Sequence, residues 1–252
     1  MSVIAILQAR VSSSRLPSKV LRPIFDKPML HYQVERVLQS KLIDKLIIAT
    51  SENPEDTPLE TLAQSLNVEC FRGDLDDVLD RFYRAAAVHS PNHVVRLTGD
   101  CPLIDPNVID KIIEHHLLSK ADYTSNANPP TYPDGLDVEV MKFSILEQAF
   151  QKAVLPSDRE HVTPYIRKQT DSYHLENVTH TEDLSNLRWT VDELDDFKFV
   201  EEIYSRLYND NSQFSMNDIL STLKIEPELA KINCKYLRNE GYLKSLKNDL
   251  SC

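Results

Sequence analysis

The chain has 252 residues, 41% of them hydrophobic, which is enough to bury one large core, so we expect a single elaborated domain over residues 1–252. Its 39 acidic and 28 basic residues give a formal net charge of -11, which disfavours a general nucleic-acid-binding protein because a phosphate backbone would be repelled. No apolar stretch reaches membrane-spanning length and no basic leader precedes the first strand-like run, which predicts a soluble, cytoplasmic protein with no membrane partner.

The first half of the chain alternates strand-like and helix-like segments. A continuous apolar run predicts a strand over residues 3–9, buried on both faces, and it leads into a polar loop over residues 10–18. Strands are then predicted at 45–50, 69–72 and 94–97, and helices at 28–38, 56–66, 76–88 and 107–118. This alternation favours an α/β fold with a doubly wound, mostly parallel sheet covered by helices.

The alternation breaks beyond Asp122. A turn-rich stretch from Asn128 to Gly135 precedes a strand at 136–141, and we predict an inserted lobe over about residues 128–178. Ser157-Asp158-Arg159-Glu160 has the form of a capping box and predicts a helix that runs to about Lys168. Further strands are predicted at 173–178 and 187–191, and helices at 197–207 and from 215 onward.

Three cations and several hydroxyl side chains lie in the loop that follows the first predicted strand, Gln8-Ala9-Arg10-Val11-Ser12-Ser13-Ser14-Arg15-Leu16-Pro17-Ser18-Lys19. Open α/β sheets bind ligands at the carboxyl ends of their strands. Arg10 and Arg15 can bind phosphate oxygens bidentately, Lys19 can act as a point charge, and backbone N–H groups of the serine run can cradle an anion. These groups suit a triphosphate, and a solvated basic loop is the alternative.

Two aspartates follow predicted strands at the same edge of the sheet. Asp100 comes directly after the strand at 94–97, and a carboxylate beside triphosphate-binding residues is a natural Mg²⁺ ligand. Asp192 follows the strand at 187–191 and can complete the same metal site. The alternatives are local, with Asp100 capping the turn before Pro102 and Asp192 capping a helix that begins near Asp195.

A second acidic motif keeps a rival enzyme class open. Asp74-Leu75-Asp76 imitates the Asp-x-Asp metal motif of glycosyltransferases, although Asp76-Asp77 is also well placed to cap the following helix. The four cysteines lack Cys-x-x-Cys spacing and are predicted to be reduced thiols rather than disulfides or zinc ligands; they are Cys70, Cys101, Cys234 and Cys252.

Ordered motifs over nearly the whole chain resemble the cytidylyltransferase family that activates sialic acid, KDO and related sugar acids, and in particular its spore coat polysaccharide biosynthesis protein F branch. The matching motifs are Gln8-Ala9-Arg10, Ser13-Ser14-Arg15-Leu16-Pro17 with Lys19, Pro28-Met29-Leu30, Gly99-Asp100-Cys101-Pro102-Leu103-Ile104, Asp134-Gly135-Leu136-Asp137-Val138-Glu139, Arg159-Glu160-His161-Val162-Thr163-Pro164-Tyr165 and Thr190-Val191-Asp192.

The resemblance implies a homodimeric enzyme that couples CTP to a sugar acid and releases pyrophosphate, with Mg²⁺ on Asp100 and Asp192 and with Arg10, Lys19 and Asp100 as catalytic residues. The nucleotide is expected to contact Gln8, Ala9, Arg10, Ser12, Ser13, Ser14, Arg15 and Lys19, with Arg72, Asp80 and Arg81 as candidates on the base side. The lobe is expected to bind the sugar through Arg159 and His161 on its carboxylate and through Asp137 and Glu139 on its hydroxyls.

The chain departs from the family at glycine positions. Ser12 and Ser18 stand where the loop is expected to hold glycine, and Asp26 or Lys27 where the turn before Pro28 usually holds it. Serine narrows or reshapes a phosphate cradle because glycine permits closer backbone approach and positive φ. A weakly active nucleotide-binding protein is therefore a further alternative, beside a glycosyltransferase.

Overall fold

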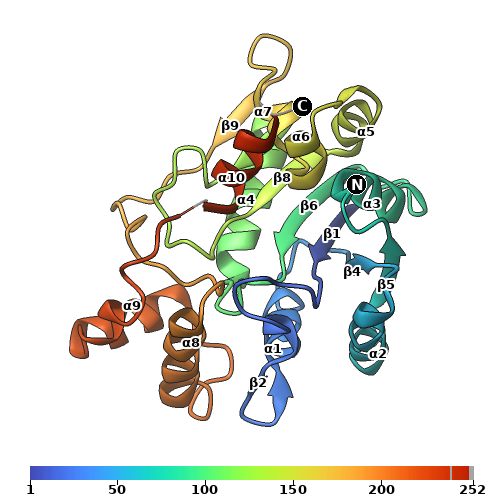
Figure 1. Ribbon diagram of the computed structural model, residues 1–252. Coiled ribbons are helices and arrows are strands. Elements are labelled where there is room, and N and C mark those ends of the chain that lie inside the picture. Colours follow the sequence, from blue (N-terminus) through green and yellow to red (C-terminus); the bar gives the residue numbers. More distant parts are fainter. Residues whose placement is uncertain (239, 250–252) are drawn as a thin grey trace.

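A computed structural model describes residues 1–238 and 240–249, and a seven-stranded sheet lies at its centre in the order β5-β4-β1-β6-β8-β7-β9 (Figure 1). The strands are β1 Val3–Gln8, β4 Lys45–Ser51, β5 Glu69–Gly73, β6 His93–Thr98, β7 Tyr123–Ser125, β8 Glu139–Lys142 and β9 Leu175–Asn177, and β2 Pro23–Ile24 with β3 Lys27–Pro28 forms a separate hairpin. The strands β5, β4, β1 and β6 are mutually parallel, whereas β8 runs antiparallel to β6 and β7. The mostly parallel, doubly wound sheet predicted from the sequence is confirmed.

Helices cover both faces of this sheet (Figure 1). They are α1 Met29–Val37, α2 Thr57–Ser65, α3 Val78–Ala87, α4 Pro106–Ser119, α5 Phe143–Lys152, α6 Pro156–His161, α7 Pro164–Arg167, α8 Leu194–Leu207, α9 Met216–Ile225 and α10 Glu240–Asp249, with 3₁₀ turns η1 Lys19–Leu21, η2 Pro54–Asp56 and η3 Leu229–Lys231.

Successive side chains of β1 enter two different cores. Val3, Ala5 and Leu7 pack with apolar residues of α1, α2, α4 and α8, whereas Ile4 and Ile6 pack with those of α3 and α5. Because side chains alternate along a strand, a continuous apolar run is needed to fill both faces. The central position of β1 places its carboxyl end, and the polar loop that follows, in the middle of one edge of the sheet.

The segment predicted as an inserted lobe extends the central sheet. Its strand β8 pairs with β6, and this register sets Glu139 opposite Arg96. Its strand β9 covers Leu175–Asn177, within the predicted strand at 173–178, and pairs with β7 at the edge of the sheet. The sheet thus carries side chains of this segment to the same edge as the loop after β1.

The helix predicted from 157 to 168 is divided in two. α6 begins at Pro156 with Leu155 at its N-cap position, so Ser157 lies inside the first turn and does not act as the predicted cap. At Val162 the backbone has φ 71° and ψ -55°, and the N–H of Thr163 donates to the carbonyl of His161 at 2.8 Å. This strained γ-turn is rare for a β-branched residue. It separates α6 from α7 and turns His161 and Thr163 toward a common cavity.

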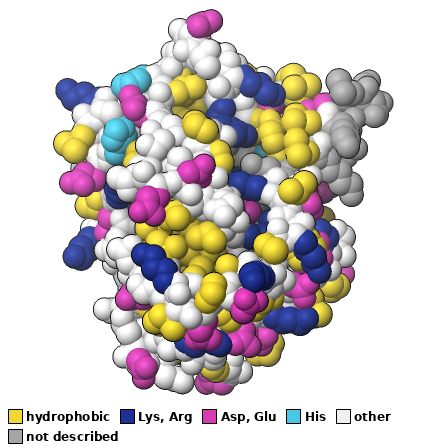
Figure 2. Space-filling view, turned by 90° about the vertical axis from the view of Figure 1, so that its left-hand side faces the viewer, with side chains coloured by type: hydrophobic (Ala, Val, Ile, Leu, Met, Phe, Trp, Pro, Cys, Tyr) yellow, Lys and Arg dark blue, Asp and Glu magenta, His cyan; other side chains and the backbone are white. Residues whose placement is uncertain are grey.

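Three further features bear on predictions made from the sequence: membrane-spanning helices, the cysteines and the surface charge. No helix in the described part of the chain combines the length and apolar character needed to cross a membrane. Cys70, Cys101 and Cys234 are free thiols, and Cys252 lies outside the described residues. On the face drawn in Figure 2, basic and acidic side chains are interspersed.

Candidate active site

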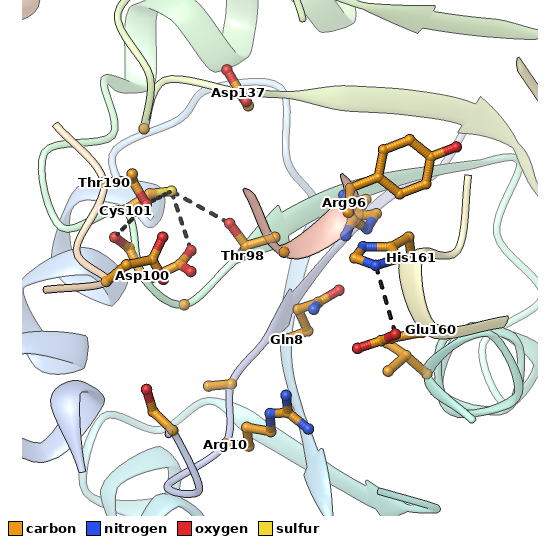
Figure 3. A pocket seen from close by; sticks show the side chains of 18 of the residues that line it. Gln8, Arg10, Arg96, Thr98, Asp100, Cys101, Asp137, Glu160, His161 and Thr190 are labelled. Carbon is orange, nitrogen blue, oxygen red and sulfur yellow. Dashed lines mark hydrogen bonds and ion pairs between the residues drawn. The ribbon is translucent and has the colours of Figure 1, made fainter. Parts of the chain in front are cut away.

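A cavity of about 410 Å³ lies at the carboxyl ends of β1 and β6. It is lined by most of the residues predicted to bind ligands, namely Gln8, Ala9, Arg10, Ser12, Ser13, Ser14, Arg15, Lys19, Arg81, Asp100, Asp137, Glu139, His161 and Asp192. Figure 3 shows Asp100, Cys101 and Thr190 on one side of the cavity, Arg96 and His161 on the other, and Gln8 between them. The side at Asp100 is called here the phosphate end and the side at Arg96 and His161 the acceptor end, after the ligand groups that the sequence analysis expects at each.

At the phosphate end, Lys19 joins the two aspartates that the sequence placed at one edge. Its Nζ lies 3.1 Å from Asp100 Oδ2, 2.8 Å from Asp192 Oδ1 and 2.8 Å from the carbonyl oxygen of Val191. Burial alone would raise the pKa of Asp100, but Lys19 and neighbouring hydrogen bonds lower it to about 2. Burial also disfavours the charged form of Lys19, but the two carboxylates outweigh it and raise the pKa of the ammonium. Lys19 and Asp100 are therefore both ionised at neutral pH.

Close backbone packing brings the loop after β1 against Asp100. The N–H of Gly99 donates to the carbonyl of Gln8 at 2.7 Å, and a Cβ at position 99 would lie 2.8 Å from the Cβ of Ala9. Ser18, directly before Lys19, has φ 56°, a left-handed conformation that favours glycine. A glycine would adopt this turn without strain, whereas Ser18 adopts it at a cost of about 1 kcal/mol.

Arg188 organises the carboxylates around Asp192, and sequence reasoning missed it. Its side chain is 6% exposed and bonds Asp196 at 2.9 Å, Asp192 at 3.1 Å and Asp134 at 3.2 Å. The segment predicted as a strand at 187–191 pairs with Asp134 through one isolated bridge. Arg188, Thr190 and Asp192 nevertheless all line the cavity, so the alternation of this extended segment was the signal that could have identified Arg188.

Gly135 explains why this segment lies so close to the cavity. It has φ 108°, and a Cβ at that position would lie 2.6 Å from the backbone nitrogen of Thr190. The N–H of Trp189 donates to the carbonyl of Asp134 at 2.6 Å. Glycine therefore lets the two chain segments touch, which fixes Thr190 and Asp192 beside the end of β6.

At the acceptor end, Glu139 holds Arg96. Its carboxylate accepts hydrogen bonds from Arg96, from the hydroxyl of Tyr123 and from the hydroxyl of Thr163, the last at 2.7 Å. Burial would raise the pKa of Glu139, but Arg96 and Arg167 lower it overall. These three bonds place Glu139 to position Arg96, and Glu139 also lines the cavity, where its predicted bond to a ligand hydroxyl stays a prediction.

Two arginine nitrogens at this end are buried without a partner. Arg96 Nε and Arg167 Nε make no hydrogen bond among the described residues, although both side chains line the cavity. Buried polar groups normally have partners, so these two guanidinium groups, both lining the cavity, keep donor capacity that their neighbours do not use. A cation within the apolar strand Val94-Val95-Arg96-Leu97 was a signal that could have identified Arg96 from the sequence.

Three predicted ligand-binding residues lie outside the cavity lining. The guanidinium of Arg159 is 2.6 Å from Asp77 Oδ2, and it also donates to two backbone carbonyls, so it ties α6 to the start of α3. Arg72 bonds the carbonyls of residues 51 and 53 and lies 3.0 Å from Glu60. Asp80 pairs with Arg84 on the surface of α3. Each of these side chains is paired with a carboxylate or a guanidinium outside the cavity.

The Asp-x-Asp motif caps a turn. Asp74 Oδ1 accepts from the backbone N–H groups of Asp76 and Asp77, and Asp77 Oδ1 accepts from the N–H of Asp80 at the start of α3. The capping alternative is therefore confirmed for Asp77. The helix after Asp192 is capped differently from the expectation, since Glu193 is the N-cap of α8 and forms a capping box with Asp196.

The sequence profile of the family described as cytidylyltransferase matches residues 4–225 of the chain. The chain belongs to the cytidylyltransferase family. It is thus a nucleotidyltransferase that uses CTP.

Relatives span nearly the whole length of this cytidylyltransferase. The spore coat polysaccharide biosynthesis protein SpsF of Bacillus subtilis is 32% identical, over 90% of this chain and 96% of that protein. An uncharacterized protein of Methanocaldococcus jannaschii is 37% identical, over 96% of this chain and 98% of that protein. The solved structure of a cytidylyltransferase from Leptospira borgpetersenii has a TM-score of 0.88 at 30% identity, covering 94% of this chain and 100% of that chain.

Proposed function

We propose that this cytidylyltransferase transfers the cytidylyl group of CTP to a hydroxyl of a sugar acid and releases pyrophosphate, in the biosynthesis of a surface polysaccharide or glycan. The observation that carries the proposal is one cavity with two chemically distinct ends. Cations and carboxylates suited to a triphosphate and its metal lie at one end, and the unpartnered nitrogens of Arg96 and Arg167 lie at the other. The SpsF protein of Bacillus subtilis, a relative over most of the chain, carries polysaccharide biosynthesis in its name.

At the phosphate end, Arg10, Arg15 and Lys19 bind the triphosphate with the backbone N–H groups of the serine run. The acceptor oxygen attacks the α-phosphorus, the bond to the bridging oxygen breaks, and pyrophosphate leaves in line. Negative charge grows on the leaving group during this step, and cations already in place stabilise it without reorganisation. Lys19 is suited to this role because burial and two carboxylates hold its ammonium in position.

Asp100 and Asp192 are suited to hold Mg²⁺. Mg²⁺ in nucleotide enzymes is commonly bound by one or two carboxylates, the remaining ligands being substrate phosphates and water. Both carboxylates lie within 3.1 Å of Lys19 Nζ, so they are close to each other. Within residues 1–238 and 240–249, no group of three or more His, Cys, Asp or Glu side chains is arranged as a metal site, so the phosphates would supply the further ligands. When bound, the ion supplies neutralisation of charge on the phosphate oxygens.

The proton of the attacking hydroxyl needs an acceptor, and Asp134 is suited to take it. Asp134 lines the cavity, on the segment that touches Thr190. Burial and the nearby charge of Asp137 raise the pKa of Asp134 to about 7, against the opposing effect of Arg238 and Arg188. A base works best when its pKa lies near the working pH.

At the acceptor end, Arg167 and Arg96 take the role that the sequence suggested for Arg159. We expect Arg167→Ala to raise the KM for the sugar acid by about tenfold or more, because a charge-assisted bond to the carboxylate is lost. Arg159→Ala is the matched control, since it removes the same charge from a neighbouring helix and breaks the bond to Asp77. Its acid KM is expected to stay near the wild-type value while its melting temperature falls. A larger rise in acid KM for Arg159→Ala than for Arg167→Ala would contradict this assignment.

A pyrophosphate-release screen that crosses the four nucleoside triphosphates with several sugar acids tests the proposed function. We expect pyrophosphate with CTP and at least one acid. Tight CTP binding without pyrophosphate from any acid would instead support the nucleotide-binding alternative. Transfer of a glycosyl group without pyrophosphate would support a glycosyltransferase.

We further propose that the enzyme is a homodimer in which residues 128–178 pack on the partner. Phe150 and Phe143 stack on Tyr83 with ring centroids 4.2 and 5.9 Å apart, and Val154, just after α5, is 84% exposed. Tyr132, an aromatic residue of the same segment, is 1% exposed and lies in the core, so it is not available to this interface. Val154→Asp is expected to weaken the dimer in sedimentation experiments at micromolar concentration. Sedimentation of the wild type as monomer alone would contradict the proposal.

A further inference from the structure

The chain continues past the residues matched by the family profile and returns to the cavity. The profile ends at residue 225, and after it the chain passes η3 and forms α10, which lies against α6 (Figure 1). Glu240, Gly241 and Tyr242 line the cavity. The described residues 236–238 and 240–249 are called here the C-terminal strap. The strap is therefore a wall of the site that lies beyond the residues matched by the family profile.

We propose that the C-terminal strap is the outer wall of the acceptor subsite, and that Tyr242 and Arg238 select which sugar acid the enzyme uses. The inference rests on the proposed function, because it takes the end of the cavity at Arg96 and Arg167 to be the place of a sugar acid.

Arg238 controls the orientation of Asp137. Its guanidinium bonds the carboxylate of Asp137, donates to the carbonyl of Tyr132 at 3.2 Å and lies 3.7 Å from Asp134 Oδ1. The side chain of Arg238 is 13% exposed, so this pair is partly shielded from water. Arg238, a residue of the strap, thus holds the carboxylate of Asp137 at the cavity wall. The position of Asp137 relative to the acceptor hydroxyls depends on Arg238.

Tyr242 lies against His161 and Arg167. Its ring centroid is 5.0 Å from that of His161, with the rings nearly perpendicular, and Arg167 Cζ lies 5.4 Å from the Tyr242 centroid. A sugar acid bound through Arg167 must therefore pass beside this ring. The aromatic face offers an apolar surface for the C–H groups and substituents of the sugar, next to polar neighbours that fix its orientation.

The strap is tied down at both of its ends. The carbonyl of Leu237 accepts from the buried Arg188 at 3.2 Å, and the carboxylate of Asp249 accepts from the backbone N–H of Ser157 at 3.1 Å. Between them, the hydroxyl of Ser245 bonds Glu160 at 2.7 Å and His161 at 2.9 Å. These attachments favour a fixed wall, which can exclude acids of the wrong shape, over a loosely held tail.

The test compares acceptor and nucleotide kinetics in wild type, Tyr242→Ala, Tyr242→Phe and Arg238→Met, using pyrophosphate release with KDO, an eight-carbon acid, and N-acetylneuraminic acid, a nine-carbon acid. Tyr242→Ala is expected to raise the KM for the better acid by about tenfold while the KM for CTP changes less than about twofold. Discrimination between the two acids, as the ratio of their kcat/KM values, is expected to fall by a similar factor. Tyr242→Phe keeps the ring and is expected to retain most of the discrimination that Tyr242→Ala loses. Lys231→Ala, which removes an exposed cation paired with Glu228, is the control for charge loss near the C-terminus.

Three results would overturn the inference. Unchanged acid KM and unchanged discrimination in folded Tyr242→Ala and Arg238→Met would show that the strap does not contact the acceptor. Equal rises in the KM values for acid and CTP would show that the strap shapes the whole cavity and does not act on the acceptor alone. If wild type forms no pyrophosphate with any acid, the proposed function fails and this inference fails with it, whereas turnover by wild type with unaffected variants removes this inference alone. Should Tyr242→Ala not fold, Tyr242→Leu keeps an apolar side chain without the ring and decides the same question.

Discussion

Lys19→Ala is expected to lower kcat by about a hundredfold while the fold is kept, because one preorganised donor to developing negative charge typically contributes that much. Lys19 donates to both carboxylates of the phosphate end and to the carbonyl of Val191, and these three bonds hold its positive charge in place beside the leaving group. Initial rates with saturating CTP and acid measure the effect. Lys45→Ala, which removes an exposed lysine paired with Glu69, is the control.

Lys19→Ala is also expected to change how the stability of the protein depends on pH, which can be measured without any substrate. Lys19 is the main group that lowers the pKa of Asp100, from 3.8 to about 2, against the opposing effect of burial. A lowered carboxyl pKa stabilises the folded state above the unfolded pKa, and this contribution is lost as pH falls through the folded pKa. Lys19→Ala should therefore unfold more easily than wild type at neutral pH, and the difference should shrink between about pH 4 and pH 2. A folded Lys19→Ala enzyme with wild-type kcat would exclude a catalytic cation at this position.

Asp192→Asn and Asp100→Asn are each expected to lower kcat/KM by about a thousandfold, because an amide oxygen is a weaker ligand than a carboxylate for a divalent ion. Asp192 is held by Lys19, Arg15 and Arg188 at 2.8, 2.8 and 3.1 Å, so the asparagine variant keeps hydrogen-bonding partners and should fold.

The decisive measurement for the aspartates is binding of Mn²⁺ in the presence of CTP, followed by electron paramagnetic resonance. Both asparagine variants should lose most of the binding seen in wild type. Asp195→Asn removes a nearby carboxylate that pairs with Lys198 and Lys235, and it should bind Mn²⁺ as wild type does. Wild-type Mn²⁺ affinity in Asp100→Asn and Asp192→Asn would rule out a metal site shared by these two residues.

A strained turn connects the architecture with the acceptor end. The helical pattern of residues 157–168 predicted one helix, but Pro164 has no N–H to continue the hydrogen bonds of α6 and instead takes the first position of α7. The helix breaks at Val162, whose backbone has φ 71° and whose side chain is fully buried. Packing in the core holds this conformation, and the turn aims the residues on either side of it into the cavity.

The sequence by itself determined the sheet, the loop that carries the cations and the edge at which Asp100 and Lys19 would meet. These features follow from local periodicity and from the rule that parallel strands end at one edge. Only the tertiary structure decided which further side chains reach the cavity. Arg159 and Arg167 lie on neighbouring short helices with similar local signals, yet Asp77 of α3 holds the first and the γ-turn at Val162 brings the second inward. Arg96 needed the pairing of β6 with β8, and Tyr242 needed the return of the C-terminal strap. Such contacts join residues far apart in the chain, and no local pattern encodes them because the partner of a charged side chain is set by packing in three dimensions.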